Sequence, residues 1–125
     1  MANDAGPRPL VVKSGAGADQ PERCVQALTV SATAVAAGAD VSLWLMGEAV
    51  WLATTGAGPE ITLPGSPPVG DLVATVLTSG RITVCTQCAA RRGLEPADFA
   101  EGVRVAGAAA YVEEVLAERV QALVY

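Results

Sequence analysis

The residues of this sequence best suited to chemistry are two cysteines, Cys85 and Cys88, within the run VCTQCAARRG. In a reducing compartment a close cysteine pair indicates redox, sulfur or metal chemistry. The chain has 3 cysteines and no histidine. The absence of histidine excludes Ser-His, Cys-His and His-metal mechanisms within one chain.

The residues around the pair predict where the thiols lie in the fold. Residues 81–85 (RITVC) are β-branched and predict a strand that ends at Cys85, and residues 86–92 predict a helix that stops at Gly93. In a parallel sheet, ligands and reactions collect at the carboxyl ends of the strands. We therefore expect both thiols near free backbone N–H groups, which stabilise a thiolate and lower its pKa.

Arg91 and Arg92 follow Cys88 by three and four residues, so a helix places them on its side, where they add positive potential as supporting residues. Inert burial of the pair is the plainer alternative. A zinc site needs four ligands, and the pair supplies two, leaving Cys24 and a carboxylate or a site shared between subunits. We expect no metal or cofactor, and Cys24 itself reads as a buried apolar residue of the first helix.

Strands and helices alternate along the sequence. The apolar pattern predicts strands at 9–13, 41–46, 81–85, 103–105 and 120–124, and helices after an Asp19 N-cap and at 48–54, 69–79, 86–92 and 107–117. Such alternation predicts an α/β fold with a mainly parallel sheet of about five strands and helices on both faces. Residues 1–8 are expected to form a flexible leader, and 9–125 a single domain.

Three further segments have plainer interpretations. The loop Gly15-Ala16-Gly17 lacks the rest of a phosphate-binding motif and predicts a tight turn at the same edge as Cys85. A short extended piece is expected at 61–63 within a proline-rich loop. The charged residues Glu113, Glu114, Glu118 and Arg119 are expected to form a solvated helix face.

Charge and hydropathy restrict the partners. The net charge is −5, and the 8 lysines and arginines are spread out, so nucleic acid is not an expected ligand. Residues 1–10 carry no signal-peptide pattern, and no apolar stretch is long enough to span a membrane, which predicts a cytoplasmic protein. A mean hydropathy of +0.39 is high for a small domain and predicts apolar surface buried between subunits.

The order of these parts resembles the DsrE/DsrF-like family, which includes sulfur-relay subunits of the TusD type. The likeness rests on Asp-x-Pro-Glu-Arg before the first long helix, a strand ending in Met-Gly-Glu, a proline-rich loop, and Val-Cys-x-x-Cys before Arg-Gly. It covers almost all of 10–125. The sulfur-accepting cysteine of those subunits matches Cys85, and many members of the wider family also carry a match to Cys88.

The resemblance implies a three-layer α/β/α sandwich, assembly into a homotrimer or homohexamer, and sulfur donor and acceptor proteins as partners. It implies a sulfurtransferase-like carrier that accepts sulfane sulfur as a persulfide on Cys85 and passes it on. Two alternatives stay open. The first is a thiol–disulfide oxidoreductase or redox sensor, in which Cys85 and Cys88 cycle between dithiol and disulfide. The second is a non-catalytic oligomeric binding protein with an inert pair.

Overall fold

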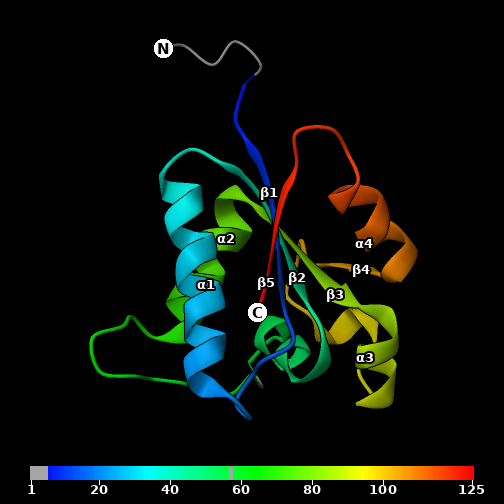
Figure 1. The fold of residues 1–125 in the computed structure, drawn as a ribbon. Helices are drawn as coiled ribbons and strands as arrows, with labels where there is room; N and C mark the ends of the chain where they lie inside the picture. The colour runs from blue at the N-terminus through cyan, green and yellow to red at the C-terminus, as the bar shows by residue number, and fades with distance from the viewer. Residues whose placement is uncertain (1–5, 57) are drawn as a thin grey trace.

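Strands and helices alternate in the computed structural model, which describes residues 6–56 and 58–125 (Figure 1). The strands are β1 (Pro9–Ser14), β2 (Asp40–Leu45), β3 (Arg81–Cys85), β4 (Arg104–Ala106) and β5 (Gln121–Val124). The helices are α1 (Pro21–Ala36), α2 (Val69–Ser79), α3 (Thr86–Arg91) and α4 (Ala108–Val115), with 3₁₀ helices η1 (Gly47–Ala53) and η2 (Pro96–Asp98). The five strands pair in parallel in the order β4-β3-β2-β1-β5, which confirms the predicted α/β fold.

The sheet lies between two helix layers. Figure 1 shows α1 and α2 on one face, with α3 and α4 on the other. Successive strand side chains point to opposite faces, so Val41, Leu43 and Leu45 of β2 enter the core with α1 and α2, while Ser42 and Trp44 face the second layer. Fully burying each such aliphatic side chain stabilises the fold by about 1.5–3 kcal/mol. No helix among the described residues is long and apolar enough to cross a membrane.

A partly buried polar network attaches α4 to the second face of the sheet. The Glu114 carboxylate accepts hydrogen bonds from Ser42 Oγ at 2.6 Å and Trp44 Nε1 at 3.1 Å, and it pairs with Arg104. Arg104 Nε also donates to Thr83 Oγ1 at 3.0 Å. The expected solvated face is therefore wrong for Glu114, because this carboxylate turns toward Ser42 and Trp44 of β2 and Arg104 of β4.

Most element bounds lie close to those predicted from the sequence, and two details differ. The bounds of α2 and β3 are as predicted. Asp19 is not the N-cap of α1: Gln20 occupies that position, and Asp19 Oδ1 accepts a hydrogen bond from the Gly17 N–H at 2.9 Å instead. Residues 61–63 form no strand. Residues 1–5 of the expected leader lie outside the described part of the chain.

Candidate thiol site

The carboxyl edge of the sheet brings Cys85 beside three loops. Cys85 is the last residue of β3 and pairs with Ala106 of β4, and α3 begins at the next residue. The loops that follow β1 and β2 reach the same edge, where the Met46 N–H donates to the Ser14 carbonyl at 2.9 Å. This placement follows from parallel pairing, since strands running the same way end on the same side.

Cys85 is the more enclosed of the two thiols, with 8% of its surface exposed. Its Sγ donates a hydrogen bond to Gln87 Oε1 at 3.5 Å. The Gln87 amide lies over the backbone of Gly107, where a Cβ would stand 3.7 Å from Oε1. Gln87, which lies in α3 directly after β3, therefore accepts a hydrogen bond from Cys85 while its amide packs against Gly107, the residue after β4.

Cys88 is partly exposed and lies in surroundings that favour its thiolate. Burial raises the pKa of Cys88, but hydrogen bonds from the Gly47 backbone N–H and the Cys85 thiol lower it. The positive charges of Arg91 and Arg92 lower the pKa further. The lowering causes prevail, so the net pKa of Cys88 lies below its ordinary value. Because the thiolate is the attacking form, this thiol is poised for nucleophilic chemistry.

Close backbone packing holds Gly47 against the neighbouring loop. Gly47 has a positive φ of 54°, and a Cβ there would lie 3.1 Å from the Gly15 carbonyl oxygen. A Cβ on Gly17 would lie only 2.6 Å from the Glu48 carbonyl oxygen. Both positions need glycine, for conformation at Gly47 and for space at Gly17. The predicted tight turn at 15–17 thus supports the residue whose N–H meets Cys88.

Arg92 ties α3 to the loop after β2. Its Nε donates to Glu48 Oε2 at 3.1 Å, and its Nη1 donates to the Cys88 carbonyl at 3.1 Å. Arg91 is exposed and contributes charge alone. The two arginines expected to support the pair therefore act differently: Arg92 by position and charge, Arg91 by charge.

Cys24 takes no part in this group. It is fully buried, and burial together with the Asp19 charge raises its pKa to about 11. The expected inert burial of Cys24 is confirmed. Across residues 6–56 and 58–125 no cluster of three or more His, Cys, Asp or Glu side chains is placed to hold a metal ion.

Sequence analysis missed Gly47, Glu48 and Gln87 as members of the site. Gly47 and Glu48 directly follow β2, the neighbour of β3 in the sheet. The rule that placed Cys85 at the carboxyl edge would have placed them there too, had the strand order been known. For Gln87 the available signal was its place between the two cysteines.

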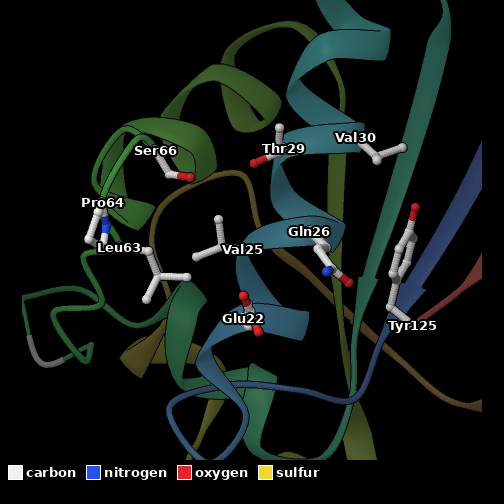
Figure 2. A pocket seen from close by; sticks show the side chains of 9 residues that line it. All are labelled: Glu22, Val25, Gln26, Thr29, Val30, Leu63, Pro64, Ser66 and Tyr125. Carbon is white, nitrogen blue, oxygen red and sulfur yellow. The ribbon is translucent and has the colours of Figure 1, made fainter.

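A separate hollow of about 590 Å³ lies along the outer side of α1. Figure 2 shows Leu63 and Pro64 on one side of the helix and the Tyr125 ring on the other, with Val25 and Thr29 between them. None of the residues that line this hollow is a cysteine. The two thiols of the pair therefore lie outside this hollow, at the carboxyl end of β3 and next to the loop after β2.

The fold and the site together place this chain among small α/β proteins that carry a pair of thiols at the carboxyl edge of a parallel sheet. The DsrE/DsrF-like family model matches residues 10–120, and the chain belongs to that family. Among curated proteins it is 31% identical over 86 residues to the uncharacterized protein MK0008 of Methanopyrus kandleri, covering 68% of each chain. It is 27% identical over 104 residues to the uncharacterized protein MJ0760 of Methanocaldococcus jannaschii, covering 82% of this chain but 38% of that protein.

Two solved structures have the same fold. The ychN protein from E. coli superposes with a TM-score of 0.75 at 18% identity, and coverage is 95% of this chain and 99% of the other. The protein MTH1491 from Methanobacterium thermoautotrophicum, whose function is unknown, gives a TM-score of 0.70 at 12% identity with the same coverage. At these identities the likeness establishes the three-layer fold.

Proposed function

We propose that this chain is a sulfur carrier, in which the Cys85/Cys88 pair accepts sulfane sulfur as a persulfide and passes it to a partner protein. Cys85 is the thiol that holds the sulfur. The family includes sulfur-relay proteins, which favours this chemistry. The observation that carries the proposal is the surroundings of the pair: one sulfur faces the Gly47 N–H and two arginines, and the other thiol lies beside it.

Sulfur exchange needs only a thiolate and a persulfide. The thiolate attacks the outer sulfur of the donor persulfide, the donor leaves as a thiolate, and the acceptor later repeats the attack on the carrier. The steps transfer sulfane sulfur with no net oxidation, and no general base or metal takes part. This requirement suits a chain that has no histidine.

The partners proposed are a sulfur donor protein and a sulfur acceptor protein in the cytoplasm. The protein itself is proposed to assemble as a homotrimer or homohexamer. Leu116, the C-cap of α4, and Val124 of β5 are 78% and 65% exposed, and such apolar surface favours burial against another copy. The acidic net charge of −5 disfavours nucleic acid.

The second candidate is a thiol–disulfide oxidoreductase. The interaction of the Cys85 thiol with the Cys88 sulfur supports it, because neighbouring thiols can close into a disulfide. In that reaction both cysteines are oxidised, a disulfide partner is reduced, and no sulfur is gained. The two candidates therefore differ in the mass of the product.

The test is intact-mass spectrometry after incubation with glutathione persulfide, followed by removal of small molecules. We expect the wild type to gain one sulfur atom and the Cys85→Ser/Cys88→Ser variant to gain none. The variant retains Cys24, so it controls for reaction elsewhere. Loss of two hydrogens without added sulfur would favour the oxidoreductase, and an unchanged wild type would leave an inert pair in a binding protein.

A further inference from the structure

The two thiols of the pair differ in access and in hydrogen bonding. Cys85 is 8% exposed, while Cys88 is partly exposed. The Cys85 thiol has a single proton and two acceptors within reach, Gln87 Oε1 at 3.5 Å and the Cys88 sulfur. The Cys88 sulfur is an acceptor, from Cys85 and from the Gly47 backbone N–H. The two sulfurs therefore differ in exposure and in the groups that face them, and the Gly47 N–H favours the thiolate at Cys88.

We propose that sulfur enters at Cys88 and moves from there to Cys85, so that the exposed thiol collects sulfur and the enclosed thiol holds it. This inference rests on the proposed carrier function and adds an order to it. A donor persulfide reaches the partly exposed sulfur first, and the thiolate is the form that attacks. Cys85 is enclosed and hydrogen-bonded to Gln87, so a donor persulfide reaches its sulfur less readily.

The two steps balance without any added reagent. In the first, the Cys88 thiolate bonds to the outer sulfur of the donor, the donor S–S bond breaks, and the donor leaves as a thiolate. In the second, the Cys85 sulfur bonds to that same outer sulfur, and the Cys88 S–S bond breaks. The Cys85 proton passes to the Cys88 sulfur along the hydrogen bond that already joins them.

The enclosed position explains why a second thiol is useful to a carrier. A persulfide on Cys88 is open to any thiol in solution, whereas one on Cys85 lies beneath the segments after β3 and β4. Access controls the rate of thiol exchange. Delivery to the acceptor follows the same route in reverse, through Cys88.

The test is rapid-quench loading with glutathione persulfide, read by intact mass, for wild type, Cys85→Ser and Cys88→Ser. Cys24→Ala is the control, because its buried thiol lies outside the pair. We expect Cys88→Ser to load about ten-fold or more slowly, because the thiolate is lost. Cys85→Ser should load at the wild-type initial rate, yet lose its sulfur faster than wild type when dithiothreitol is added.

Entry at Cys85 would overturn the proposal, and it would appear as wild-type loading in Cys88→Ser with none in Cys85→Ser. The carrier function would survive that result. Equal rates of sulfur loss to dithiothreitol in the wild type and Cys85→Ser would also overturn the proposal, since no sulfur would then be held on the enclosed thiol. If the wild type gains no sulfur, both the order and the carrier function fail.

Discussion

Cys24 and Cys88 have the same thiol group, but their surroundings shift its pKa in opposite directions. Burial and the Asp19 charge raise the pKa of Cys24 to about 11, whereas the Gly47 N–H, the Cys85 thiol and two arginines bring the pKa of Cys88 below its ordinary value despite burial. Reactivity toward electrophiles follows the thiolate fraction. At neutral pH the native protein should therefore be alkylated at Cys88, while Cys24 stays unmodified.

Arg92 offers a test of how the surroundings of Cys88 act. Arg92→Ala removes a positive charge and the link from α3 to Glu48, so the thiolate is disfavoured and the pKa of Cys88 rises. We expect iodoacetamide to modify Cys88 roughly two- to five-fold more slowly at neutral pH, with the pH profile displaced upward. Peptide mass spectrometry across a pH series measures it.

Arg92→Lys is the matched control, because it keeps the charge but cannot bond to Glu48 and the Cys88 carbonyl together as the guanidinium does. A pH profile between those of the wild type and Arg92→Ala would show that the charge and the hydrogen bonds of Arg92 both contribute. Arg91→Ala should give a smaller displacement than Arg92→Ala, since Arg91 acts on Cys88 by its charge alone, whereas Arg92 also bonds to Glu48 and to the Cys88 carbonyl. A wild-type profile in Arg92→Ala would contradict the role given to this residue.

At the scale of elements, α4 depends on one carboxylate. Desolvation raises the pKa of Glu114, but hydrogen bonds from Ser42, Trp44 and Arg104 and the Arg104 charge lower it by more. The Trp44 ring beneath is fully buried, lies edge-on to Tyr111 with centroids 5.3 Å apart, and carries the Arg104 guanidinium 5.3 Å from its centroid. The network thus joins the helix to β2, β3 and β4.

Glu114→Gln should destabilise the protein by about 1–3 kcal/mol, the usual range for hydrogen bonds to a charged group. Because the folded-state pKa is lowered, this stability is present above the unfolded pKa and is lost as pH falls through the folded one. The variant should therefore lose part of the acid dependence seen in the wild type. Urea unfolding at several pH values measures both effects.

The exposed neighbour provides the control for that measurement. Glu113→Gln should change stability by no more than about 0.5 kcal/mol, as is usual for a surface site. Equal unfolding curves for Glu114→Gln and Glu113→Gln would mean that the network contributes nothing to the attachment of α4.

Sequence patterns predicted elements better than contacts between them. The bounds of α2 and β3 were predictable because local signals mark them, with Pro68 before the helix and Gly80 between the two elements. The partners of Glu114 were not, since Ser42 lies 72 positions away in sequence. The N–H of Gly47 was missed for the same reason: it meets Cys88 only when β2 and β3 are neighbours.

At the scale of the whole molecule, large apolar side chains remain exposed on the last third of the chain. These side chains lie in α4, at its C-cap and in β5: Val112, Leu116, Leu123 and Val124. Strand β5 is also an outer strand, with no partner on its far side among the described residues. Monomeric proteins rarely leave such surface uncovered, which supports the proposed homo-oligomer.

Leu116→Asp should weaken the proposed assembly, because a carboxylate would replace a leucine that is 78% exposed in the single chain and that the assembly would bury between copies. The variant should keep the wild-type circular dichroism and sediment as a smaller species. Thr75→Asp, at an exposed site on α2, is the control and should assemble as the wild type does. A wild type that sediments as a monomer at all concentrations would contradict the proposed assembly.

The central claim, that the Cys85/Cys88 pair carries transferable sulfur, is tested most directly by cyanolysis of the persulfide-loaded protein. Cyanide removes sulfane sulfur as thiocyanate, which is counted after small molecules have been removed. The account predicts about one thiocyanate per wild-type chain and none from Cys85→Ser/Cys88→Ser. Equal release from the two proteins, or none from the wild type, would contradict it.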